Sequence, residues 1–103
     1  MKGYVYLICD PAADTYKIGR TNNDVQKRLK QLQTGCSSEL FIVNQYETDY
    51  PVQLESFLHR KFINKRQLNE WFKLESFDIK NFNNVCRHYE EIIKSLNTEE
   101  PVL

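Results

Sequence analysis

Residues 3–19 read GYVYLICDPAADTYKIG, and this stretch predicts the first unit of the fold. Its first seven residues are mostly β-branched, aliphatic or aromatic, as in strands, and they end at a segment rich in Asp and Pro, which favours a loop. Strand-type residues resume at Thr15 and run to Gly19. We therefore predict a β-hairpin with a medium-length loop. Side chains alternate along a strand, so Tyr4, Tyr6 and Ile8 are expected on one face and Val5, Leu7 and Cys9 on the other.

The segment after the hairpin predicts a helix that carries positive charge. Residues 22–24 are Asn, Asn and Asp, which commonly cap helix N-termini, and Gly35 is a natural C-terminal stop. Between them, apolar residues recur at the spacing of one helical face. They are Val25, Leu29 and Leu32, and the basic residues Lys27, Arg28 and Lys30 lie off this stripe.

The rest of the chain continues in short elements. We predict a third strand at residues 40–46, a second helix that begins near Pro51, a further short strand at residues 71–74 and a long amphipathic helix at about residues 78–97. These elements together predict an α+β fold. At 103 residues, the chain fits a single domain spanning residues 1–103, with its core at about residues 3–74.

Composition and charge narrow the function classes. The sequence is 41% hydrophobic and 27% charged, which is ordinary for a globular protein and excludes disorder as the main state. The formal net charge is +0, so total charge does not indicate nucleic-acid binding. From Lys17 to Lys30, however, there are five basic residues and one acidic residue. This segment predicts either a basic binding face or simply a solvated helix face.

The three cysteines, Cys9, Cys36 and Cys86, are odd in number and scattered, so we expect neither a disulfide framework nor a structural zinc site. Free thiols fit a reducing compartment. The sequence begins without a signal-peptide pattern and has no apolar run near the roughly 20 residues of a bilayer span. We therefore expect an intracellular protein, in the cytoplasm or nucleus, with no membrane partner.

Five short segments, taken in order, resemble the motifs of the GIY-YIG nuclease superfamily, and most closely its small viral and phage branch. They are YVY at residues 4–6, YKIGRT at 16–21, KRL at 27–29, the segment 54–62 and EWF at 70–72. The resemblance spans about residues 3–74. It implies a small three-stranded antiparallel sheet flanked by helices. It also implies an endonuclease that cleaves DNA with one divalent metal ion.

The resemblance also implies roles for three side chains. Tyr6 would help to deprotonate the attacking water, Arg28 would bind the scissile phosphate, and Glu55 would hold Mg²⁺ or Mn²⁺. The chemistry is consistent, because Mg²⁺ prefers oxygen ligands and is often held by only one or two carboxylates. A metal ion of this kind polarises the phosphate and stabilises the leaving oxygen.

Two further catalytic positions stay open at this point. If Gly19 sets the register of the second motif, Lys17 stands where the family has tyrosine, and Tyr16 is displaced by one residue. Adjacent strand residues face opposite ways, so only one of the two can serve. His59 lies four residues after Glu55 on the second helix, where it would orient the carboxylate, contact substrate or simply complete the helix surface.

The expected partner is DNA, contacted through its backbone by Arg20, Lys27, Lys30 and Lys61, with low sequence specificity. Asn69 is a candidate for an asparagine often found late in the family's site. The main alternative is a nucleic-acid-binding or regulatory module of the same fold with weakened catalysis. A third class is a protein-interaction domain. The sequence does not choose between a monomer and a homodimer.

Overall fold

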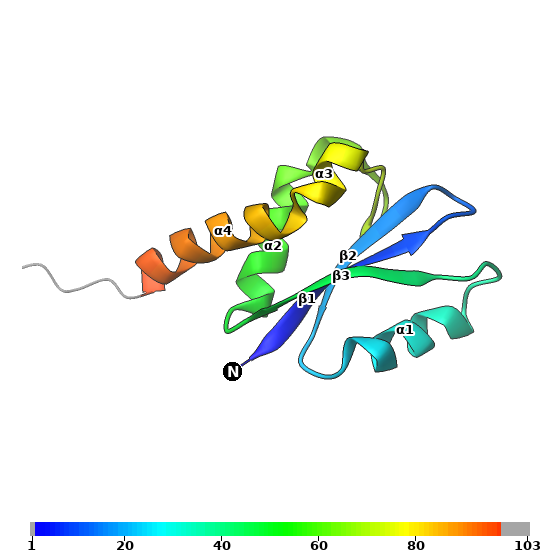
Figure 1. The fold of residues 1–103 in the computed structure, drawn as a ribbon, viewed down its shortest axis with the longest axis horizontal. Coiled ribbons are helices and arrows are strands. Elements are labelled where there is room, and N and C mark those ends of the chain that lie inside the picture. Colours follow the sequence, from blue (N-terminus) through cyan, green and yellow to red (C-terminus); the bar gives the residue numbers. More distant parts are fainter. Residues whose placement is uncertain (1, 98–103) are drawn as a thin grey trace, which may run out of the picture.

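The computed structural model describes residues 2–97, so Met1 and residues 98–103 of the expected 1–103 domain lie outside the described part. The fold is α+β, with a five-stranded antiparallel sheet in the order β3-β1-β2-β5-β4 (Figure 1). The elements are β1 (Gly3–Asp10), β2 (Thr15–Thr21), α1 (Val25–Thr34), β3 (Phe41–Thr48), α2 (Pro51–Lys61), η1 (Ile63–Lys65), β4 (Arg66–Leu68), β5 (Trp71–Phe72), α3 (Ser76–Lys80) and α4 (Phe82–Asn97).

The predicted hairpin is confirmed as β1 and β2, which pair from Tyr4↔Thr21 to Asp10↔Thr15. β1 also pairs with β3, so β1 lies inside the sheet and its residues 5–8 are buried on both faces. This explains why the first strand is an almost continuous apolar run. No helix among residues 2–97 combines the length and apolar character needed to cross a bilayer.

The expectation of three strands is wrong, because two short strands extend the sheet beyond β2. Of the strand predicted at residues 71–74, only Trp71–Phe72 forms, as β5, which pairs with β2 at Tyr16↔Phe72 and Lys17↔Trp71. β4 pairs with β5 and forms the edge of the sheet on that side. All three residues of β4 are exposed, so they show no alternation of apolar and polar side chains that would identify a strand.

Helices cover both faces of the sheet. Figure 1 shows α1 on one side and α2 with α4 on the other. The predicted faces of β1 are confirmed, because Tyr6 and Ile8 pack in a small core that Val25 of α1 completes, whereas Val5 and Leu7 belong to the larger core beneath α2 and α4. α1 and α2 therefore lie on opposite faces of the sheet (Figure 1), and side chains from both helices can reach the outer edge of β2.

The prediction of a single long helix at about residues 78–97 is wrong near its start, where the structure has two helices. The structure has a short helix, α3, whose C-cap is Asn81, followed by α4 from Phe82 to Asn97. Asp78 is not the start of a helix but the third residue of α3. Its side chain accepts a hydrogen bond from the backbone N–H of Glu75, while the Glu75 side chain accepts one from the backbone of Asp78. This capping box starts a separate helix ahead of α4.

Asp78→Asn is expected to destabilise the fold by about 1–2 kcal/mol, because the amide keeps an acceptor oxygen but loses the charge that strengthens its hydrogen bonds from Lys65 and the Glu75 amide. Burial disfavours the charged Asp78, but hydrogen bonds from Lys65 Nζ at 2.6 Å and from the Glu75 amide hold its pKa below the usual value. The stabilisation is therefore complete above the unfolded-state pKa and is lost as pH falls through the lower folded-state pKa. Urea unfolding of both proteins at pH 7 and at pH 2.5 should show the difference shrinking in acid.

The matched control for this prediction is Asp49→Asn. Asp49 pairs with Lys2 at 3.6 Å on the exposed surface, where an ion pair contributes little. This variant should unfold like the wild type at pH 7. Equal stability of the Asp78 variant and the wild type at pH 7 would contradict the role given to the capping box.

Candidate active site

The outer edge of β2 carries a cluster of polar side chains. β5 pairs with β2 only at Tyr16 and Lys17, and no other strand of residues 2–97 covers the remainder of this edge. A pocket of about 150 Å³ opens there. Side chains from β1, β2, α1, α2 and the β4–β5 turn line it, and they are Tyr6, Arg20, Arg28, Glu55 and Glu70.

Tyr6 reaches the pocket from the middle of the sheet because its partner in β2 is Gly19. A Cβ atom on Gly19 would clash with the hydroxyl and ring of Tyr6, so only glycine leaves room for the ring to cross β2. Arg28 Nε donates a hydrogen bond to this oxygen at 3.2 Å, and Arg28 Nη1 donates to Gln31 at 3.0 Å. The phenol and the guanidinium are thus fixed side by side.

Gly19→Ala is expected to destabilise the protein by about 1–3 kcal/mol, because the added methyl overpacks the core and displaces the Tyr6 ring. Gly35→Ala is the control. Gly35 caps α1 with φ −98°, and a Cβ there would meet nothing within 4 Å, so this variant should be neutral or slightly stabilising. Urea unfolding measures both differences, and equal stability of the two variants would contradict the packing argument.

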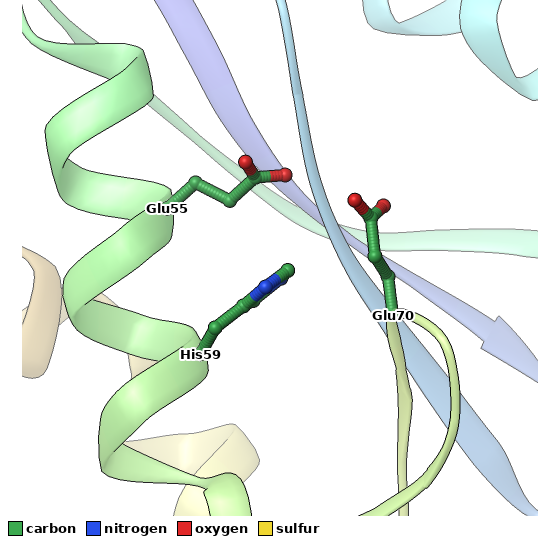
Figure 2. A group of neighbouring side chains, drawn as sticks. All are labelled: Glu55, His59 and Glu70. Atoms are coloured by element: carbon green, nitrogen blue, oxygen red, sulfur yellow. The ribbon is translucent and has the colours of Figure 1, made fainter.

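Three potential metal ligands face one another beside Tyr6. Glu55 and His59 lie one turn apart on α2, and Glu70 lies in the turn between β4 and β5; Figure 2 shows the two carboxylates pointing toward each other, with the imidazole beside them. One ligand atom from each residue lies within 4.8 Å of the other two. The Glu70 carbonyl accepts a hydrogen bond from the Ile18 amide at 3.1 Å, which fixes the turn against β2.

Each carboxylate is also paired with a basic side chain. Lys17 Nζ lies 2.8 Å from Glu70 Oε1, and Arg20 Nε lies 3.3 Å from Glu55 Oε1. Burial raises the pKa of Glu55, and the negative charge of Glu70 raises it further, while the nearby basic groups oppose the shift. The repulsion between the two carboxylates favours a divalent cation between them, whereas Lys17 and Arg20 would compete with that cation.

The structure places the two open candidates on opposite faces. Lys17 is buried and its ammonium reaches Glu70, with the Trp71 ring centroid 5.8 Å away. Tyr16 packs against the larger core, on the side of α2 and α4, and does not line the pocket. Of the two, Lys17 alone contacts a residue of the pocket.

His59 is oriented by the backbone of β2. Its Nε2 lies 2.8 Å from the carbonyl oxygen of Ile18, and its ring tilts against Phe72 with centroids 5.1 Å apart. A carbonyl only accepts hydrogen bonds, so Nε2 carries the proton and Nδ1 of the neutral ring keeps a lone pair. Of the three expected alternatives, completing a helix surface does not account for this contact with β2, whereas orienting Glu55 and contacting substrate both stay predictions.

The four expected DNA contacts separate into three locations. Arg20 lines the pocket itself. Lys27 and Lys30 line an adjoining groove of about 280 Å³ that shares Arg28 with the pocket. Lys61 lies at the end of α2, with its Nζ 5.5 Å from the Phe62 ring centroid, and lines neither cavity.

Sequence reasoning assigned no role to Glu70, although the EWF segment contains it. A lone glutamate beside Trp71 has no sequence pattern of its own, and only the fold of the β4–β5 turn brings it to the pocket. Asn69, the candidate for a late asparagine, adopts φ 53° in that turn, a left-handed conformation that asparagine tolerates. The position of Asn69 thus has a backbone explanation, and Asn69 does not line the pocket.

The family model for the T5orf172 domain matches residues 3–94. The match runs from β1 into α4 and includes every residue that lines the pocket. No match was found among curated proteins or among solved structures.

Proposed function

We propose that this chain, which belongs to the T5orf172 domain family, is a metal-dependent endonuclease that hydrolyses phosphodiester bonds of DNA by GIY-YIG-type chemistry. One observation carries the proposal. Tyr6, Arg28 and Glu55, which come from β1, α1 and α2, line the same small pocket. Three side chains with complementary roles in phosphodiester hydrolysis therefore meet at one place, although they are far apart in the sequence.

The residues around Glu55 fit a divalent metal ion, because ligand atoms of two carboxylates and an imidazole lie within 4.8 Å of one another. We expect Glu55 to be the principal ligand for Mg²⁺ or Mn²⁺. When bound, such an ion polarises the phosphate and stabilises the charge that develops on the leaving oxygen.

Arg28 is placed to bind the scissile phosphate. A guanidinium has five N–H donors, and Tyr6 and Gln31 accept hydrogen bonds from only two of its nitrogens. The remaining donors can bind phosphate oxygens in the planar geometry that arginine provides. Because Tyr6 accepts from Arg28, the position of its own hydroxyl proton is also restricted.

Tyr6 would handle the proton of the attacking water. Burial raises the pKa of Tyr6, although the hydrogen bond and charge of Arg28 act to lower it. The phenol is therefore neutral in the protein alone. It could accept a proton from water only after giving up its own proton to solvent, and further positive charge in the pocket would favour that loss. A metal ion bound by Glu55 would supply that positive charge in the same pocket that Tyr6 lines.

The groove beside α1 supports a polynucleotide substrate. Lys27 and Lys30 line it together with Arg28, so a strand bound at the pocket would pass two exposed ammonium groups. Contacts of this kind position the backbone without reading bases, and we expect low sequence specificity.

A second candidate function is a nucleic-acid-binding or regulatory module without cleavage. The ion pairs Lys17–Glu70 and Arg20–Glu55 favour it, because they satisfy both carboxylates without a metal ion. The position of Tyr16 outside the pocket also favours it. This candidate predicts salt-dependent DNA binding and no cleavage.

The test is plasmid nicking with Mg²⁺ or Mn²⁺, compared with the same reaction in EDTA. Metal-dependent nicking is expected from the wild type, and Tyr6→Phe should lower its rate by about 100-fold, the lower range for loss of a proton-transfer group. Tyr4→Phe is the control, since Tyr4 shares the face of β1 but does not line the pocket. Binding without nicking would favour the second candidate, and wild-type nicking by Tyr6→Phe would remove the role of the phenol.

A further inference from the structure

We infer that Glu55, His59 and Glu70 act together as the protein ligands of one divalent cation, and that the imidazole makes this site prefer Mn²⁺ to Mg²⁺. The inference rests on the metal site of the proposed function. It extends that site from one carboxylate to a set of one nitrogen and two oxygen donors, and it gives His59 and Glu70 a direct role.

The spacing of the three side chains fits a shared ion. Ligand atoms at about 2.0–2.2 Å from a metal can be no more than about 4.4 Å from each other. The three atoms already lie within 4.8 Å of one another without any ion between them. Small rotations of the two flexible glutamate side chains would therefore complete the site, and the backbone of α2 and of the β4–β5 turn need not move.

The hydrogen bond of His59 matches that of a metal-binding histidine. Ligating histidines almost always donate their second ring N–H to a carboxylate or a backbone carbonyl, which fixes the tautomer and the ring direction. The carbonyl of Ile18 is that acceptor for Nε2, at 2.8 Å. With Nε2 as the donor, the neutral form of the ring would carry its lone pair on Nδ1, and Nδ1 would then be the nitrogen ligand of the inferred site.

The charges around the site indicate that an ion would replace existing partners. Lys17 and Arg20 each contact one of the two carboxylates in the protein alone. A divalent cation between the carboxylates supplies the positive charge that these side chains now provide. Arg20, whose side chain is 44% exposed, is then released toward the pocket that it lines, where a phosphate would bind.

The donor set determines the metal preference. Mg²⁺ prefers oxygen ligands and gives up its water shell reluctantly. Imidazole suits first-row transition metals, and carboxylates suit Mn²⁺ as well as Mg²⁺. A site with one imidazole and two carboxylates therefore binds Mn²⁺ more tightly than Mg²⁺, whereas a site with Glu55 alone would discriminate little.

Calorimetric titration of the whole chain with MnCl₂ and with MgCl₂, without DNA, tests the ligand set. We expect tighter binding of Mn²⁺ by the wild type. Glu55→Gln, His59→Gln and Glu70→Gln should each weaken Mn²⁺ binding by at least about 10-fold, as loss of a ligand or its support does. The controls are Glu47→Gln on the exposed side of β3 and His88→Gln on the exposed side of α4, which should bind as the wild type does.

Pulsed EPR of the Mn²⁺ complex gives a second readout that needs no disruptive variant. The chain has two histidines, so ¹⁴N coupling to bound Mn²⁺ that persists in His88→Gln assigns the nitrogen to His59. Absence of this coupling in the wild type would overturn the inference. So would undetectable Mn²⁺ binding, or unchanged affinity in folded His59→Gln and Glu70→Gln proteins.

The outcomes for this site and for the proposed function can be separated. Mn²⁺ binding that depends on all three residues, without nicking of DNA, would support the metal site and remove the nuclease function. Nicking that depends on Glu55, with Mn²⁺ affinity independent of His59 and Glu70, would support the nuclease and overturn the three-ligand site.

Discussion

Glu55→Gln is expected to lower the rate of metal-dependent nicking by about 1000-fold, which corresponds to about 4 kcal/mol of barrier. The substitution keeps the shape of the side chain but removes its charge. Glu55 loses its ability to hold a cation, and Arg20 loses its ion-pair partner at 3.3 Å. The effect on folding should be small, because burial already disfavours the charged form of Glu55 and glutamine keeps the shape of the side chain.

Nicking rates at saturating Mn²⁺, with unfolding curves for each protein, check this prediction. Glu47→Gln removes the same charge from an exposed position on β3 and should nick at the wild-type rate. If the Glu55 variant cleaves as fast as this control, the assigned metal role is wrong. If neither variant nor wild type cleaves but all bind DNA, the module without catalysis is the better description.

The strands and helices that bury an alternating or helical stripe were predictable from the sequence. β1 shows its apolar run because it has neighbours on both edges and helices on both faces. α1 was located by its polar N-cap and by Gly35, and the structure has it from Val25 to Thr34 with Asp24 as the cap. In these elements, local preference and burial agree.

The elements that were missed are those in which local pattern and tertiary contact differ. β4 is held by pairing with β5 at one edge while its side chains stay exposed, so its residues show no strand pattern. α3 and α4 share one continuous amphipathic pattern, but Asn81 is the C-cap of α3 and ends that helix before α4 begins at Phe82. Hydrophobic periodicity does not show where a cap ends a helix.

The candidate site shows the same limit. Tyr6, Arg28 and Glu55 could be placed by resemblance, and the pocket unites them. To choose between Lys17 and Tyr16, one must know which side chain of β2 points toward the pocket. The pairing of β2 with β5 fixes that direction. Glu70 became visible only when the β4–β5 turn was seen to fold back against Ile18, since a lone glutamate beside Trp71 has no pattern of its own.

Arg28→Ala is expected to lower the nicking rate by about 1000-fold, in the range measured when a phosphate-binding arginine is lost in phosphoryl transfer. The Tyr6 hydroxyl would also lose its donor, at a cost of about 1 kcal/mol in stability. Binding of DNA should weaken only a few-fold, because Lys27 and Lys30 still line the groove. Filter binding and nicking, measured on the same preparations, separate the two effects.

Arg28→Lys makes this prediction sharper. Lysine keeps the positive charge but presents a single ammonium, which cannot both hold the Tyr6 oxygen and grip a phosphate in the planar geometry of a guanidinium. The variant should therefore restore DNA binding fully and nicking only in small part. Arg87→Lys is the control, since Arg87 is exposed on α4 and bonds only to Asn84 on the same helix. If Arg28→Lys nicks like this control, charge alone accounts for the role of Arg28, and the paired geometry of phenol and guanidinium is not needed.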